Sequence, residues 1–242
     1  MRMSFPAEET FAGFFERWMK QLEDHLRNLI TSAKEGGEPD YESVVSNITA
    51  HHKAYYAAKW AAAPEDVLAF FSPSWLSPFE KAYLWATGWK PSTTFRLVES
   101  LRQTRAPLTS LTQMSEEQVK RIEKLRARTR LEEEGVEREM ERQQVAVANR
   151  KMVELARLSS RVREGDAGRS EVDRLVEAAV SGLLAGLVSV MKAADRARLK
   201  TLKGVLDVLG PRQCADFLAV FSLLQIQQRR WGSQRESLAE TT

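Results

Sequence analysis

The chain has 242 residues, and its 36 Lys and Arg exceed its 33 Asp and Glu by only three, although 29% of its residues are charged. The apolar fraction of 43% excludes a wholly disordered chain. A net charge of +3 is too small to indicate a polyanion-binding surface unless positive charges cluster. Cys214 is the only cysteine, which excludes an intramolecular disulfide and makes a cysteine-based zinc site very improbable. A packed globular protein in a reducing compartment fits these counts.

The N-terminal segment shows neither a secretory signal nor a transit peptide, because Arg2 is followed by Glu8 and Glu9 rather than by an apolar run. The most apolar stretch runs from Ala178 to Met191, and charged residues bound it on both sides. A membrane span needs about 20 apolar residues, which exceeds this stretch. We therefore expect no membrane span, and a helix that is buried on most sides in a soluble core.

Prolines punctuate the first half of the chain and are nearly missing from the second half, which is therefore free to form long helices. Apolar residues recur at helical spacing in several segments, and capping residues mark their ends. The predicted helices are Phe11 to near Gly36-Gly37, Tyr41 to Ala62, one that begins at Pro64 to Asp66, Ser77 to Gly88, Thr93 to Leu101, Ser115 to about Arg163, Ser170 to Met191, Ala194 to Leu209, and Pro211 to about Trp231.

Two of these helices have distinctive signals. Ser77, Pro78 and Glu80 fit an N-cap, a first helical residue and the third position of a capping box. The helix that starts at Ser115 interleaves positive and negative charges without a sustained heptad, which favours a solvated helix held by weak ion pairs over a coiled coil.

No segment alternates apolar and polar residues over more than a few positions, so strands are not expected. We predict an all-α fold: a single multi-helix domain over residues 11–236, with long helices in its C-terminal two thirds. A short tail at 1–10 precedes this domain, and a disordered tail at 237–242 follows it.

Catalysis is not expected, because the chain has no phosphate-binding loop, dinucleotide fingerprint or nucleophile elbow. His51 and His52 are helix neighbours that point about 100° apart, so they cannot bind one metal centre from one face. We expect no metal site, ordinary packing or surface roles for the histidines, and a buried, inert thiol at Cys214.

Five of the six tryptophans and all four tyrosines lie within the first 89 residues. Aromatics at this density usually build a core. The alternative is that some of them, with Phe70, Phe71 and Tyr83, line a groove or cavity for a partner helix or an apolar ligand. Both roles can hold for different residues.

One stretch of the chain resembles the signature of the plant Delay of Germination domain, which also forms the C-terminal region of TGA-class bZIP transcription factors. Further matching residues lie near both ends of the chain, from Phe14-x-x-x-Trp18 to Arg229-Arg230-Trp231. The signature residues are Asp66-Val67, Phe70-Phe71-Ser72, Trp75, Ser77-Pro78-Phe79-Glu80, Leu84-Trp85, Gly88-Trp89 and Pro91-Ser92.

The resemblance implies an all-helical, non-enzymatic plant protein that regulates seed dormancy, abscisic-acid or stress responses by binding other proteins. Family members bind type 2C protein phosphatases or transcriptional coactivators, and bZIP factors are further candidate partners here. The candidate docking residues are Trp75, Phe79, Glu80, Trp85 and Trp89. Direct sequence-specific DNA binding is not expected, because no basic helix continues into a zipper.

The dormancy member of the family binds haem through C-terminal histidines, but the last histidine here is His52, so we expect no haem; His51 and His52 are the only candidates. Two alternatives to an adaptor stay open. One is a sensor that binds an apolar ligand, a fatty-acyl chain or haem, between helices. The other is a transcriptional cofactor that reaches DNA through a bZIP partner. The expected location is the nucleus, the cytoplasm or both, and a homodimer is left open.

Overall fold

The computed structural model describes residues 10–34, 40–103, 110–162 and 168–240. Within these ranges every regular element is a helix, apart from an isolated bridge between Trp85 and Gly88. The all-α prediction is confirmed. The elements are α1 (Phe11–Lys34), α2 (Tyr41–Ala62), α3 (Leu68–Phe71), α4 (Pro78–Ala82), α5 (Thr93–Gln103), the 3₁₀ turn η1 (Ser110–Gln113), α6 (Glu116–Ala146), α7 (Arg150–Arg161), α8 (Arg169–Leu206) and α9 (Pro211–Glu240).

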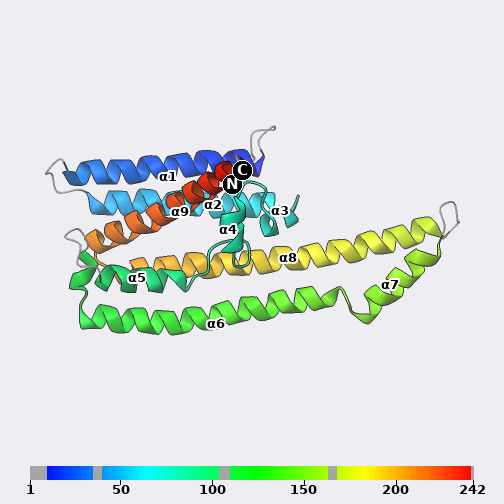
Figure 1. Cartoon of the computed structure of the whole chain (residues 1–242). Helices are drawn as coiled ribbons and strands as arrows, with labels where there is room; N and C mark the ends of the chain where they lie inside the picture. The colour runs from blue at the N-terminus through cyan, green and yellow to red at the C-terminus, as the bar shows by residue number, and fades with distance from the viewer. Residues whose placement is uncertain (1–9, 35–39, 104–109, 163–167, 241–242) are drawn as a thin grey trace.

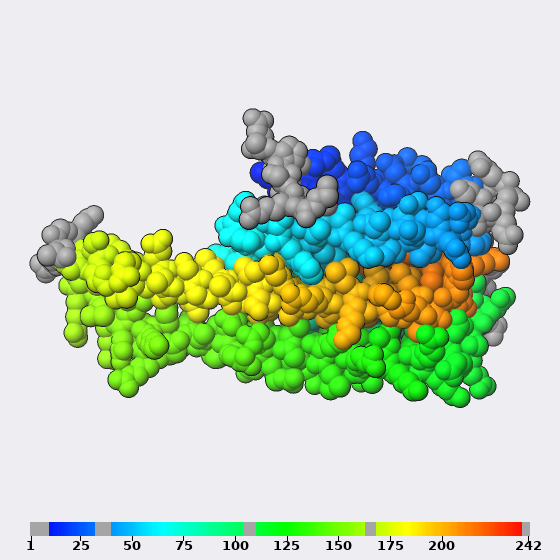
Figure 2. All heavy atoms as spheres, turned by 180° about the vertical axis from the view of Figure 1, so that it is seen from behind, coloured from blue at the N-terminus to red at the C-terminus, as the bar shows by residue number. Residues whose placement is uncertain are grey.

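The helices α1, α2 and α9 pack against one another, and the long helix α8 lies between α2 and α6 (Figures 1 and 2). The short α4 packs on α9, while α5 and η1 cover the other end of α9. At one end of the molecule α6, α7 and α8 extend beyond the other helices (Figure 1). The fold therefore has a bundled part and a protruding part.

The main core lies where α2, α5, α8 and α9 meet. Ile48, Phe95, Val205, Phe217 and Leu218 contribute to it from these four helices, and each is 1% exposed or less. Burial of such side chains is the principal stabilising term of a fold of this kind.

A second cluster joins α1 to α9 through aromatic and aliphatic side chains, among them Phe15, Trp18, Leu22 and Ile226. The expectation that most of the aromatics build a core is therefore confirmed. Cys214 is also buried: its thiol donates to the Leu206 carbonyl oxygen at 3.3 Å, and burial raises its pKa to about 11. The predicted burial of this thiol is confirmed, and its inertness stays a prediction.

Local sequence signals locate several helix starts correctly. Helix α2 has the predicted bounds, and the Asp40 carboxylate accepts a hydrogen bond from the Ser43 amide at 3.0 Å. At α4 the Ser77 hydroxyl accepts from the Glu80 amide, and the Glu80 carboxylate accepts from the Ser77 amide. This reciprocal pair is the predicted capping box.

Two predicted helices in the first half have other bounds than expected. Helix α3 begins at Leu68 rather than near Pro64, because residues 63–65 form a turn; the Asp66 carboxylate accepts from the Ala69 amide at 3.1 Å just before the helix. Helix α4 ends at Ala82 rather than at Gly88, because the chain then enters the turn around the isolated bridge.

The predicted helix from Ser115 to about Arg163 is in fact two helices. Helix α6 ends at Ala146, and α7 begins at Arg150. The Asn149 side chain accepts from the Met152 amide at 3.0 Å and so caps α7. Asparagine is a strong N-cap, and this local bond competes with helix continuation.

The two helices predicted at Ser170–Met191 and Ala194–Leu209 are one continuous helix, α8. Lys192 and Ala193 lie between the predicted segments, and both are good helix formers. At the C-terminus α9 continues past Trp231 to Glu240, into the segment expected to be a tail. The predicted helix end near Gly36-Gly37 lies outside the described residues.

The prediction that Ala178 to Met191 is buried on most sides is wrong. Only 11% of the most apolar window of α8 is buried, and the flanking Leu175 and included Val180 are 40% and 43% exposed. The reason is that this half of α8 runs beyond the bundle, where α6 and α7 cover part of its surface (Figure 2). By length and composition alone, α8 is also long and apolar enough to cross a membrane. Helices of soluble proteins pass the same test, and the absence of a membrane span stays a prediction.

We refer to α7 together with residues 169–189 of α8 as the helical arm. Its residues have fewer buried apolar contacts than the inner half of α8, where Val190, Met191, Ala194 and Val205 are fully buried. Local opening should therefore need less free energy in the arm. We expect amides of residues 172–186 to exchange hydrogen before those of residues 192–206, measured by mass spectrometry on the native protein. Equal protection along α8 would contradict this arrangement.

Candidate functional site

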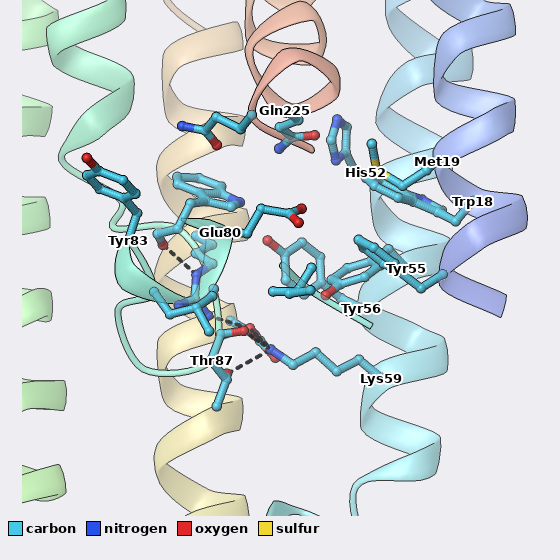
Figure 3. A pocket seen from close by; sticks show the side chains of 18 of the residues that line it. Trp18, Met19, His52, Tyr55, Tyr56, Lys59, Glu80, Tyr83, Thr87 and Gln225 are labelled. Atoms are coloured by element: carbon cyan, nitrogen blue, oxygen red, sulfur yellow. Dashed lines mark hydrogen bonds and ion pairs between the residues drawn. The ribbon is translucent and has the colours of Figure 1, made fainter. Parts of the chain in front are cut away.

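A cavity of about 150 Å³ opens where α1, α2, α8 and α9 meet the segment 76–89 (Figure 3). Aromatic rings form most of its wall, and polar or charged side chains lie at its two ends. The aromatic lining residues are Phe15, Trp18, Tyr55, Tyr56, Phe79, Tyr83 and Trp89.

Buried charges close one end of the cavity (Figure 3). The Asp195 carboxylate accepts from Lys59 Nζ at 2.9 Å and from Arg198 Nη1 at 2.6 Å, and all three side chains are 1% exposed or less. Asp195 also accepts from Trp60 Nε1 at 3.0 Å. Lys59 makes two further bonds, to the carbonyl and hydroxyl oxygens of Thr87. The three protons of its ammonium group are thereby all used.

Burial lowers the pKa of Lys59 to about 8, and the neighbouring Asp195 carboxylate acts in the opposite direction. Burial also raises the pKa values of Tyr55 and Tyr56 above their ordinary value. Both phenols are therefore neutral hydrogen-bonding groups at physiological pH.

The turn beside the ion cluster is strained. Ala86 and Thr87 have φ angles of 39° and 70°, in the left-handed region that β-branched residues avoid. Arg198 Nε donates to the Trp89 carbonyl at 2.7 Å, and its Nη2 donates to the carbonyls of Trp85 and Ala86. The guanidinium thus stabilises the turn.

A glycine makes this close approach feasible. A Cβ atom at Gly88 would lie 2.9 Å from Arg198 Cζ, which is too close for a real contact. The Gly88-Trp89 pair of the signature therefore has a steric cause: the backbone must lie directly against the guanidinium.

The histidines pack between helices. His51 Nε2 donates to the Trp18 carbonyl at 3.0 Å, and Trp18 Nε1 donates to the His51 carbonyl at 3.0 Å. The two rings are stacked, with centroids 4.8 Å apart. His52 is 3% exposed and lines the cavity. Burial lowers the pKa of His51 to about 4 and that of His52 to about 3. The packing role is confirmed.

Three of the five predicted docking residues line the cavity: Phe79, Glu80 and Trp89. The other two lie elsewhere. Trp75 packs against the rings of Phe11 and Phe70, at centroid distances of 5.0 and 5.5 Å.

Trp85 faces α6. Its Nε1 donates to the Glu137 carboxylate at 2.9 Å, and the same carboxylate pairs with Lys90 at 2.8 Å. The predicted groove around Trp75 to Trp89 is therefore not one site, because these residues divide among the cavity, the aromatic core and the contact with α6. No group of three His, Cys, Asp or Glu side chains in the described ranges is placed to hold a metal ion.

Sequence reasoning missed the ion cluster and most of the α2 wall. Lys59 follows Tyr56 by three residues and His52 by seven, so it lies on the buried face of α2. The available signal was a lysine on the apolar face of α2; the Asp-x-x-Arg spacing at Asp195 and Arg198 lies in a charge-rich segment, which gave no sign that this pair is buried.

Comparison with known proteins identifies the family of this chain. The family model of DOG1, described as seed dormancy control, matches residues 18–100, which include α2 and the turn 85–89. "Protein DOG1-like 4" of Arabidopsis thaliana is 51% identical over 94% of this chain and 94% of its own length. The chain belongs to the DOG1 family.

Two other relatives of this DOG1-family protein are informative. "Protein RESPONSE TO ABA AND SALT 1" of Arabidopsis thaliana is 28% identical, over 81% of each chain. "TGACG-sequence-specific DNA-binding protein TGA-2.1" of Nicotiana tabacum is 27% identical over 91% of this chain but only 46% of its own length. About half of that DNA-binding protein therefore resembles 91% of the DOG1-family chain.

Asp195 should be the most sensitive member of the ion cluster. Asp195→Asn leaves two buried cations without a counter-charge, and breaking a buried pair in this way costs about 3–5 kcal/mol. Lys59→Met removes the excess cation and leaves Asp195 paired with Arg198. We expect a smaller loss of unfolding free energy for Lys59→Met, measured by guanidinium chloride denaturation at pH 7.5. An equal or larger loss for Lys59→Met would refute this ranking.

The buried histidines should make the protein sensitive to acid. The pKa values of His51 and His52 are lower in the folded protein than in the unfolded chain, so below about pH 6.5 the unfolded chain binds more protons than the folded protein. The free energy of unfolding therefore falls as the pH drops from about 6.5 toward 4 for His51 and toward 3 for His52. Between pH 7.5 and 5.0 each contributes a loss of about 2 kcal/mol. The loss should be about 4 kcal/mol smaller in the His51→Gln/His52→Gln variant. Urea denaturation at both pH values measures it, and equal losses for the two proteins would contradict the assignment.

Proposed function

We propose that this DOG1-family protein is a non-enzymatic plant regulator that binds other proteins in transcription-linked seed dormancy, abscisic-acid or stress signalling. The family description, seed dormancy control, and the name of the relative RESPONSE TO ABA AND SALT 1 support this signalling context. The likeness to a sequence-specific DNA-binding protein supports a link to transcription and a nuclear location.

The exposed apolar surface of the helical arm carries this proposal. Val153 and Leu158 of α7 and Leu175 and Val180 of α8 are each between 40% and 48% exposed. Helix surfaces that stay in water are normally polar, so these four exposed apolar side chains, which lie on more than one side of the arm, offer apolar contacts to a partner. The outer part of the arm, α7 with the first turns of α8, stands clear of the bundle, so that a partner can reach it (Figure 1).

The occupant that we propose for the arm is a TGA-class bZIP factor. Such a factor carries its own region of the same kind, since half of TGA-2.1 resembles this chain. We propose that the two homologous regions pair with each other, as copies of one chain do in a homodimer. The second class of partner that we propose is the type 2C protein phosphatases. Comparing their binding with that of the TGA-class factor tests whether the arm surface is selective.

Negative charges on the arm should weaken this contact. We expect Leu175→Asp/Val180→Asp to weaken binding to a purified TGA-class factor by about tenfold or more, because central apolar contacts dominate interface energies. The matched control is Leu131→Asp, on α6, where the side chain is 66% exposed. Biolayer interferometry measures affinity, and circular dichroism checks that both variants fold.

Unchanged binding of the arm variant would exclude the arm as the docking surface. Light scattering on the same variants reports a homodimer. Co-sedimentation with lipid vesicles tests the contrasting idea that the apolar part of α8 contacts a membrane.

DNA should be reached only through the partner. In a gel-shift assay with a TGACG-containing duplex, the DOG1-family protein alone should give no shifted band, and it should supershift the band of the bZIP factor. A shift by the protein alone would show direct binding and contradict this form of the proposal.

A ligand sensor is the second candidate, and the aromatic cavity favours it. We expect native mass spectrometry of the purified protein to show an apolar adduct. An absorbance scan should show no haem band, because Trp18 engages His51 Nε2 and His52 is enclosed. A haem band, or protein without an adduct even after incubation with fatty acid, would count against this candidate.

A further inference from the structure

The outward face of α8 changes from uncharged to basic along its length. Figure 2 shows this helix, in yellow to orange, between α2 and α6. Residues spaced three or four apart share one face of a helix, and two such sets follow each other on α8. The first set is exposed and uncharged: Leu175, Ala178, Gly182, Ala185 and Ser189. The second set is cationic: the partly exposed Lys192 and the exposed Arg196, Lys200 and Lys203.

Contacts on both sides fix the position of the cations. The Arg196 guanidinium lies 5.8 Å from the centroid of the Trp60 ring on α2, and Lys200 pairs with Glu132 on α6. The cations therefore lie between α2 and α6, on the face that Figure 2 shows. Exposed Arg128 lies one turn before Glu132, on the same side of α6. We call Lys192, Arg196, Lys200 and Lys203 of α8 with Arg128 of α6 the basic strip.

Carboxylates of the protein compensate only part of this charge. Lys200 pairs with Glu132, and Lys203 pairs with Asp207 at 2.5 Å. The other three cations of the strip have no carboxylate partner among the described residues. The five cations and two carboxylates leave a net charge of +3, which equals that of the whole chain. Positive charge is thus concentrated here, while the remaining charges of the chain balance.

The spacing of the strip also differs from that of a helix face held by its own ion pairs. Lys192, Arg196 and Lys200 follow one another at four-residue intervals, where like charges destabilise a helix. On the side of α6 that faces α5, by contrast, Arg126 pairs with Glu123 at 3.4 Å. Negative charge supplied by another molecule would relieve the repulsion along the strip.

The two halves of the face together select the chemistry of a partner. A basic surface favours an acidic partner by charge complementarity. A nucleic acid carries phosphate charge along its whole length and has no use for the uncharged half. A protein segment can be acidic in one half and apolar in the other. The surface is open to such a segment, since a Cβ atom added at Gly182 would meet no atom within 4 Å.

We propose that this face of α8 binds a helix of a partner protein that is acidic in one half and apolar in the other, with its acidic residues over the basic strip. Acidic residues are favoured near a helix N-terminus, and the strip lies in the C-terminal half of α8, so the partner helix runs antiparallel to α8. The inference rests on the helical arm as the docking surface of the proposed function, and it adds the charge that the partner must carry.

The test uses two synthetic helical peptides of about 28 residues, long enough to cover the face from position 175 to 203. One carries Glu residues in its N-terminal half and Leu and Ala in its C-terminal half, and the other has Gln in place of Glu. We expect the full chain to bind the Glu peptide about tenfold more tightly in low salt, measured by fluorescence anisotropy. Adding about 0.5 M NaCl should reduce this difference, because salt screens exposed charges.

Variants then locate the acidic half of the peptide. Arg128→Gln/Lys192→Gln/Arg196→Gln removes the three cations that lack a carboxylate partner, and it should weaken binding of the Glu peptide about five- to tenfold and leave that of the Gln peptide unchanged.

The matched control is Lys20→Gln/Lys53→Gln/Lys81→Gln, which removes the same charge from exposed positions on α1, α2 and α4. It should change the affinity for the Glu peptide less than about twofold. Circular dichroism checks that both variants fold, and the comparison of the two peptides on the unaltered protein stands even if one does not.

Three results would overturn the inference: equal affinity for the two peptides, equal effects of the two triple variants, or tighter binding of a DNA duplex than of the Glu peptide. The last result would assign the strip to nucleic acid. Binding of neither peptide would also overturn it. The arm as a docking surface for a TGA-class factor is judged separately, by the effect of Leu175→Asp/Val180→Asp on that factor.

Discussion

A single carboxylate, that of Asp195, joins α2, α8 and the turn 85–89. It lies without measurable exposure between Lys59 and Arg198, and these two cations hold the turn through its carbonyl oxygens. A buried ion cluster contributes little net stability compared with an apolar core of the same volume. The cluster connects these elements, because each of its hydrogen bonds joins Lys59 of α2 or Arg198 and Asp195 of α8 to a neighbouring element or to one another.

The ion cluster holds the strained turn at Ala86 and Thr87 in place. Positive φ angles at Ala86 and Thr87 cost about 1–3 kcal/mol each, and they persist because the surrounding structure holds them. The Thr87 hydroxyl and carbonyl both accept from Lys59, so a β-branched residue with a positive φ is held by two hydrogen bonds. The turn also places Trp89 in the wall of the cavity. The ion cluster therefore holds the turn that completes the wall of the aromatic cavity.

Helix bounds that depend on side chains only a few residues away can be predicted from the sequence. The capping box at Ser77 and Glu80 and both bounds of α2 depend on side chains within a few residues, and both were predictable. The break before Asn149 was less visible, because asparagine also occurs within helices. The exposure of Val180 could not be read from its neighbours, since it depends on where α2 and α3 end in space (Figure 2).

The make-up of the candidate site also depends on contacts between residues far apart in the sequence, which sequence patterns do not reveal. Phe79, Glu80 and Trp89 line the cavity, whereas Trp75 and Trp85 face other parts of the fold, although all five lie within one short stretch. Residues that complete the cavity come from α1, α2, α8 and α9, and their convergence is a tertiary property. Only the charged residues at apolar positions, Lys59 and Asp195, had a signature that could be recognised in advance.

The buried thiol of Cys214 has a practical consequence. It is the only cysteine, it lies in the main core, and its raised pKa keeps it protonated. A thiol-specific reagent reacts with it only when the core around α9 opens, because the thiolate is the reactive form and the folded protein hides it. The protein thus carries a natural reporter of its own core opening: the rate of labelling at one atom follows the population of the open state, with no introduced probe.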